Sequence, residues 1–480
     1  MKKNVSTPGR TLALMSLSLF AVLWAVWFFG YRYFLVWLEG FSYFSTLPDF
    51  MDMHEHIQYG FLTYIGSFLH QFYAMPAAGA AIQAFIGTWI VVCTGVVIIR
   101  IFKNAEGALW MSFIPLPFFI FIQFWDLQMV NSVFWLLVMT ALLVLVIGIT
   151  LIKRPQLQLP AFICWKPLNI TALVIASAVS IYMLLFMDPR NKVHEEQVYL
   201  EYLGEHHKWE QILKEVSPRD AASDDLKKRY ALLALSETGK LTDYAFAYGL
   251  SNSDDFIFYE NINPLCLNFN ALFYQCLDMH NAVIHQAYQQ GVQSQFGVSF
   301  STLRRLADTY LELEDYELAK KYIDILSHSF CHKKWVKERI PELEAIRDAE
   351  PEYVTDEYKA TISNFTHTIS SMVDMNRGDR KYADLYFCSI LADEDAFKFK
   401  ERLHELVPVL YPSGVTIPRL YEEALILISA IDPSATDGLK ISDSTLKAFD
   451  EYANMMNGGK GTQALRRFAG TYWVYSYTRG

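Results

Sequence analysis

Hydrophobic and polar positions divide the chain into two parts with different patterns. In the first part, long apolar runs follow one another with few charges between them. We expect a transmembrane helix in each run, at about 11–31, 78–99, 108–125, 132–152 and 168–187. About 20 apolar residues are needed to cross roughly 30 Å of hydrocarbon. The third run contains Pro115 and Pro117, so we expect it to be kinked and packed against its neighbours.

From residue 190 onward, apolar positions recur at the spacing of amphipathic helices. The clearest stretch is "STLRRLADTYLELEDYELAKKYIDIL", in which two apolar stripes flank a break at Glu314-Asp315. It is similar to a tetratricopeptide repeat, where small residues let the two helices of a pair touch. Ala307 and Ala319 stand at the matching positions. Looser pairs of helices surround Gly239, Asp278 and the segment 392–394.

The two patterns together predict an all-α protein. We expect an N-terminal bundle of about five transmembrane helices in residues 1–189, followed by a tetratricopeptide-like helical repeat domain, an α-solenoid, in residues 190–480. Repeat arrays bury a continuous core and leave a concave face for a partner. The leading functional prediction is an integral membrane protein whose repeat domain is a scaffold for a protein or peptide partner.

Lys and Arg positions predict the orientation in the membrane, because cytoplasmic loops carry an excess of both residues. Lys2, Lys3 and Arg10 precede the first run, and neither residue type occurs between Tyr33 and Ile99. Basic residues return at Arg100, Lys103, Lys153, Arg154 and Lys166. We therefore expect a multi-pass inner-membrane protein with a cytoplasmic N-terminus, and with 39–77, 126–131 and the repeat domain on the periplasmic side. If the third run does not cross, the repeat domain faces the cytoplasm.

Charge and cysteine content narrow the chemistry. The formal net charge is -10, which argues against nucleic acid as a partner and leaves the lipid bilayer and a protein. Four cysteines of the second part are either free thiols or two disulfides: Cys266, Cys276, Cys331 and Cys388. No zinc-type spacing, phosphate-binding loop, HExxH or G-x-S-x-G motif occurs, so no metal and no cofactor are expected.

The stretch "LPDFMDMHEH", residues 47–56, concentrates acids and histidines between two apolar runs. Asp49 and Asp52, with Asp126 on the same side, are the catalytic candidates if the protein is an enzyme. This layout is similar to that of polyprenol-dependent glycosyltransferases, where an aspartate acts as general base or holds a divalent cation. His54, Glu55 and His56 are candidate binding residues.

A structural interpretation of the same stretch is that it begins a helix. Thr46 can cap that helix, Pro48 suits its first position, and acids in a first turn favour the helix dipole. The residues that follow carry an apolar stripe at helical spacing, with Gln58, Ser67 and Gln71 opposite. We therefore expect an external interfacial helix at about 57–73.

The chain as a whole resembles an uncharacterised family of Bacteroidetes inner-membrane proteins with a tetratricopeptide-like C-terminal region. The segments that carry this resemblance are "FLHQFYAMPAAGAAIQAF" (68–85), "GKLTDYAFAYG", "LRRLADTYLELEDYELAKKYIDIL" and "FAGTYWVYSYTR". The resemblance implies a membrane protein with a helical repeat region and no assigned reaction.

Overall fold

The structure, a computed structural model, describes residues 7–152, 157–187, 189–259, 263–294, 296–349, 351, 364–411 and 416–479. These residues form helices and turns and contain no β-strand, as expected for an all-α protein. Lys2, Lys3, Lys153 and Arg154, which contribute to the predicted orientation, lie outside the described residues.

The chain forms two compact units that alternate along the sequence. The first consists of Met1–Tyr199 and Gly291–Pro351, and the second of Leu200–Gln290 and Glu352–Gly480. Part of the segment expected to form repeats therefore lies in the same unit as the apolar helices. That residues 190–480 act as one repeat domain stays a prediction.

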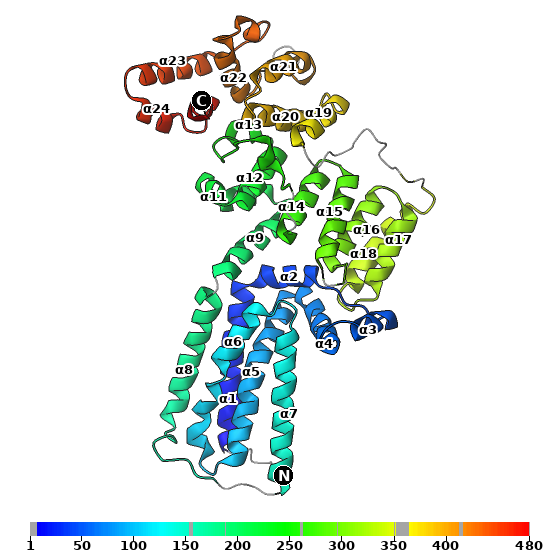
Figure 1. The fold of residues 1–480 in the computed structure, drawn as a ribbon, viewed down its shortest axis with the longest axis vertical. Helices are drawn as coiled ribbons and strands as arrows, with labels where there is room; N and C mark the ends of the chain where they lie inside the picture. Colours follow the sequence, from blue (N-terminus) through cyan, green and yellow to red (C-terminus); the bar gives the residue numbers. More distant parts are fainter. Residues whose placement is uncertain are drawn as a thin grey trace. The chain divides into compact units, whose positions relative to one another are not determined.

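The first unit contains the apolar helices and two groups of shorter helices (Figure 1). Its elements are α1 (Thr7–Gly30), α2 (Arg32–Phe41), α3 (Pro48–Glu55), α4 (Gly60–His70), η1 (Gln71–Ala74), α5 (Pro76–Ile101), η2 (Ala105–Phe113), α6 (Leu116–Trp125), α7 (Val130–Ile152), α8 (Pro167–Tyr182), η3 (Met183–Met187), α16 (Phe300–Glu312), α17 (Tyr316–Ser327) and α18 (Lys333–Ala345). α9 (Pro189–Glu205) and α15 (His280–Gln293) have residues in both units.

Among the described residues, five helices are long and apolar enough to span a membrane, which confirms the number of long apolar helices expected from the sequence. α5 is the most buried of them, and it packs against α1, α7 and η2. Glycine allows α1 and α5 to approach closely, since a Cβ at Gly95 would lie 2.4 Å from a methyl carbon of Leu12. Trp89 Nε1 donates to Thr140 Oγ1 at 2.9 Å and ties α5 to α7.

The third apolar run is interrupted, as its prolines predict. It begins as the 3₁₀ helix η2 and continues as the α-helix α6 after a turn at Ile114 and Pro115. Proline lacks the backbone donor that a continuous helix requires at this point. About half of this apolar run is buried, which confirms the expected packing. The break between η2 and α6 confirms the expected kink.

Contacts between connecting segments show which segments lie together at each end of the bundle. At one end, Asn104 accepts a hydrogen bond from Leu159 N at 3.1 Å and donates one to Leu159 O at 2.9 Å. At the other end, α4 contacts the turn before α7, because a Cβ at Gly66 would lie 2.5 Å from Gln128 O. Residues 102–104 therefore lie beside 157–159, and residues of 60–70 lie beside 128.

α2 follows α1 after a break at Tyr31 and lies across the end of the bundle (Figure 1). Two glutamates hold its ends. The Glu195 carboxylate accepts from Tyr33 N at 3.1 Å and Phe34 N at 2.7 Å, where α2 lacks a side-chain cap of its own. Burial raises the pKa of Glu195 to about 7, although these backbone donors oppose the rise. The other glutamate, Glu39, is described with the candidate sites.

The second unit is built from short helices joined by tight turns. Its elements are α10 (Trp209–Glu215), α11 (Pro218–Ser223), α12 (Asp225–Glu237), α13 (Leu241–Tyr244), η4 (Ser253–Phe256), α14 (Pro264–Cys276), α19 (Phe365–Met375), α20 (Arg380–Ala392), α21 (Ala396–Leu410), α22 (Arg419–Ser429), η6 (Pro433–Thr436), α23 (Asp443–Asn457), α24 (Gly461–Arg467) and α25 (Tyr472–Arg479). All six cysteines of the chain are free thiols, in line with the free-thiol alternative.

One type of turn closes many of the short helices. A residue with positive φ is followed by a residue whose N–H bonds to the carbonyl five positions earlier, at 2.8–3.0 Å. The positive-φ residues are His207, Gly239, Asp278, Glu314 and Glu394. This is the Schellman arrangement, which ends a helix and satisfies its last carbonyls. The breaks that the sequence predicts at Gly239, Asp278, Glu314 and Glu394 are therefore turns between helices.

Candidate functional sites

The acidic stretch 47–56 forms α3, and most of its charged side chains point into solvent. Asp49, Asp52, Glu55 and His56 are all exposed. Pro48 occupies the first helical turn as expected, but the expectation that Thr46 caps the helix is wrong. Leu47 occupies the cap position, and the Thr46 hydroxyl instead donates to His328 O at 3.0 Å.

His54 differs from its neighbours because it is buried. Its Nδ1 lies 2.6 Å from Phe50 O. The ring packs against the aromatic rings of Phe50, Tyr64 and Phe296, with centroids 4.6–5.4 Å apart. Nε2 has no hydrogen-bond partner in the described part of the chain. This surrounding makes His54 part of a small aromatic core rather than a group presented to solvent.

Asp126, the third catalytic candidate, is also buried. Its Oδ2 accepts from Ser132 N at 2.5 Å, so the carboxylate caps the first turn of α7. Asp126 thus has a structural partner, whereas Asp49 and Asp52 lie on the exposed side of α3.

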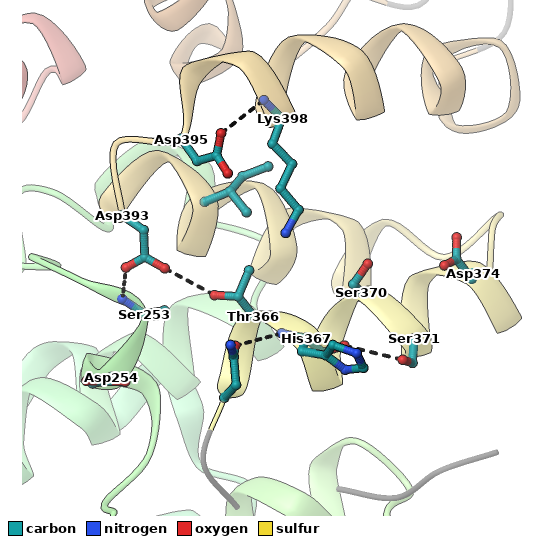
Figure 2. Close-up of a pocket in the computed structure, with 12 residues that line it drawn as sticks. Ser253, Asp254, Thr366, His367, Ser370, Ser371, Asp374, Asp393, Asp395 and Lys398 are labelled. Carbon is teal, nitrogen blue, oxygen red and sulfur yellow. Dashed lines mark hydrogen bonds between the residues drawn. The ribbon is translucent and has the colours of Figure 1, made fainter. Parts of the chain in front are cut away.

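A polar groove of about 500 Å³ lies in the second unit (Figure 2). It is formed where η4, α19, the end of α20 and the start of α21 meet. Its lining residues are Ser253, Asp254, Asn364, Thr366, His367, Ser370, Ser371, Asp374, Ile390, Asp393, Asp395 and Lys398. No local sequence pattern predicts this groove, because its lining comes from three separate stretches of the chain.

Hydrogen bonds to the turns and helix ends hold the groove's wall in place. Asp393 accepts from Ser253 N at 2.8 Å and from the Thr366 hydroxyl at 3.2 Å, and so joins η4 to α19 and α20 (Figure 2). Asn364 caps α19 and Asp395 caps α21, each by accepting a backbone N–H of its helix. These side chains are therefore fixed before any ligand arrives.

The groove is suited to binding polar groups. Four of its lining residues are aspartates, against Lys398 and His367, so its carboxylates outnumber its basic side chains. The Ser371 hydroxyl donates to His367 O at 3.3 Å, and the Thr366 hydroxyl donates to Asp393. Because each of these hydroxyls already donates its one proton, it can only accept a hydrogen bond from a ligand. Neither is paired with a histidine ring as a nucleophile requires.

A buried charged cluster in the first unit joins α2 to α16–α18. Glu39 is fully buried, with its carboxylate 2.9 Å from His332 Nε2 and 3.5 Å from Arg304 Nη2. Ser329 Oγ lies 3.0 Å from His332 Nδ1. Burial on its own would raise the pKa of Glu39, but Arg304 and His332 lower it below its usual range. Sequence reasoning missed this cluster, although a glutamate within the apolar stretch "RYFLVWLEGF" was a signal for it.

Gln71 strengthens the same junction. Its Oε1 accepts from Phe330 N at 3.0 Å, and Thr46 N donates to His328 O at 2.9 Å. The neighbouring His70 is buried, and burial lowers its pKa to about 4. The segment 328–332 is thus held from both sides by residues that flank α3 and α4.

Comparison with known proteins gives one match. A family model matches residues 8–187 and also residues 150–479, and it describes a family of unknown function, DUF6057. No curated protein and no solved structure matches the chain.

Proposed function

The chain belongs to DUF6057, a family of unknown function, and we propose that it is an inner-membrane scaffold whose helical-repeat region binds a protein partner. The observation that carries this proposal is the preformed polar groove at the ends of α19–α21. The resemblance to Bacteroidetes inner-membrane proteins is part of the same proposal.

The proposed orientation places the N-terminus in the cytoplasm and residues 190–480 in the periplasm. The Lys and Arg distribution favours it. The loop contacts also support it, because the third run, 105–123, connects the end of the bundle that holds 102–104 to the end that holds 128. A third run that crosses leaves an odd number of spans between the two termini.

The proposed repeats are degenerate tetratricopeptide-like helix pairs. Four of the positive-φ residues that close helices, His207, Gly239, Asp278 and Glu314, are spaced about 30–40 residues apart, near the 34 residues of a tetratricopeptide repeat. In the pair α16–α17, Ala307 and Ala319 are fully buried, as the close contact of such a pair requires.

We propose that the groove accepts a polar segment of the partner that carries basic side chains. Its excess of aspartates would attract such a segment and disfavour an acidic one. Half-buried Ser370 and exposed Asp254 lie in the lining, where they can add hydrogen bonds to the partner.

The experiment is site-specific photocrosslinking of the full chain in its host membrane. With His367→p-benzoylphenylalanine, we expect a discrete protein adduct, which Asp254→Lys should weaken by reversing a charge in the groove. Asp450 is exposed on α23 and does not line the groove, so Asp450→Lys is the matched control and should leave the adduct unchanged. No adduct from position 367, or equal losses with both lysine variants, would contradict the proposal.

The alternative function, a polyprenol-dependent glycosyltransferase with acids in its first external loop, keeps Asp49, Asp52 and Asp126 as its catalytic candidates. A divalent cation would be a cofactor only in that case. No feature of the described residues favours this alternative over the scaffold. The combined variant Asp49→Asn with Asp52→Asn separates the two functions, because a scaffold should retain its cellular function, whereas the enzyme should lose it.

A further inference from the structure

α4 packs Tyr64 and Phe68 against the rings of Phe44, Phe50 and Phe330, but it leaves its other large apolar side chains facing outward. The buried face is made of small and polar residues: Gly60, Thr63, Gly66, Ser67 and His70. Phe61, by contrast, is 68% exposed, and Leu62, Ile65 and Leu69 are only partly buried. A soluble helix buries its apolar stripe, so the outward face of α4 requires an apolar environment outside the protein.

The position of α4 along the bundle indicates what that environment is. Gly66, in the middle of α4, lies against Gln128 O, two residues before α7 begins at Val130. α7 is the least buried of the five apolar helices, so most of its surface faces lipid if it spans the membrane. Leu127, in the turn between α6 and α7, is 51% exposed. α4 therefore lies beside the start of α7 (Figure 1), and exposed apolar side chains occur on α7, in the turn before it and on α4.

The flanking residues agree with a location at the membrane surface. Tyr59 and Met75, at the two ends of the α4–η1 segment, are 62% and 53% exposed. Aromatic side chains are enriched at the membrane–water interface. The absence of Lys and Arg from Tyr33 to Ile99 means that apolar contact, rather than attraction to anionic headgroups, would hold the segment there.

We propose that the outward face of α4 lies in the boundary between headgroups and acyl chains of the leaflet next to the start of α7, with phospholipid as its partner. Exposed Asp49 and Asp52 of α3 then remain in water. Because Gln71 and Thr46 bind the segment 328–332, a lipid-embedded α4 also holds α16–α18 at the membrane surface. This inference is independent of the proposed groove partner and requires only that α7 spans a membrane.

The test is photocrosslinking of the purified full chain in phosphatidylcholine vesicles, with adducts identified by mass spectrometry. Phe61→p-benzoylphenylalanine changes one exposed aromatic side chain into another, so it should preserve the fold. We expect an adduct with the mass of phosphatidylcholine at position 61. Val144, 63% exposed on α7, provides the positive control, and exposed Asp52 provides the control for a residue in water.

Each result decides the proposal. Lipid adducts at positions 61 and 144, together with no lipid adduct at position 52, support the proposal. A lipid adduct at 144 alone overturns it, as does an adduct at 61 that joins two copies of the chain. A chain with p-benzoylphenylalanine at both 61 and 144 tests whether the substitution at 61 disturbs the fold. Loss of the lipid adduct from position 144 in that chain indicates a misfolded variant. In that case Tyr59→p-benzoylphenylalanine, on the exposed residue preceding α4, is the deciding measurement and must give the lipid adduct.

Discussion

Glu39 is the residue through which α2 contacts the buried cluster on α16–α18. Its carboxylate is removed from water completely, and the Arg304 guanidinium and the His332 ring are the groups that lie against it. Burying a charge costs several kcal/mol per ion, and only close partners offset that cost. Removing Glu39 leaves the buried His332 ring and the partly exposed Arg304 side chain without their carboxylate partner.

We predict that Glu39→Ala destabilises the first unit by about 3–5 kcal/mol, the usual cost of breaking a buried ion pair. Glu39→Gln keeps the shape and should cost less. Thermal unfolding of the full chain in detergent, followed by protease resistance of residues 291–351, measures the difference. Equal stability of Glu39→Ala and the unmodified chain would show that the cluster contributes nothing.

The same residue predicts an acid dependence. The pKa of Glu39 is lowered from 4.5 in the fold, so its stabilising effect is complete above pH 4.5 and is lost as the pH falls below that value. The stability gap between the unmodified chain and Glu39→Gln should therefore narrow below pH 4.5.

At the scale of elements, the tight contact between α16 and α17 is the feature most clearly encoded in the sequence. Ala319 is fully buried on α17, which packs against α16. We predict that Ala319→Trp costs roughly 1–3 kcal/mol or more by overpacking this contact. Glu317→Trp, an exposed position on the same helix, is the control. A melting temperature unchanged by Ala319→Trp would rule out the close helix pair.

Elements defined by local patterns could be predicted, whereas features formed between distant segments could not. Apolar length predicts the five spans, and helical periodicity predicts the breaks at Gly239, Asp278, Glu314 and Glu394. Glu39 and Arg304 are 265 positions apart, and Ser253 and Asp393 of the groove wall are 140 apart. No local pattern signals such pairs. Thr46 was assigned wrongly because its hydroxyl has a better acceptor in His328, far along the chain.

At the scale of the whole molecule, the predicted orientation can be measured directly. We predict that a reporter active only in the periplasm is active when fused after Gly480, because the proposed orientation has five crossings, one for each candidate span, between a cytoplasmic N-terminus and the C-terminus. The same reporter fused after Pro160, in the loop before α8, should be inactive. Activity of a cytoplasm-only reporter at the C-terminus would contradict the orientation.

The alternation of the two units along the chain also determines the order in which the protein can be completed during synthesis. Glu39 leaves the ribosome long before Arg304 and His332, which belong to the returning segment Gly291–Pro351. At roughly 5–20 residues per second, translation of the intervening chain takes on the order of tens of seconds. For that time Glu39 of α2 is without both of these partners. The junction of α2 with α16–α18 can therefore form only after more than half of the chain has been made.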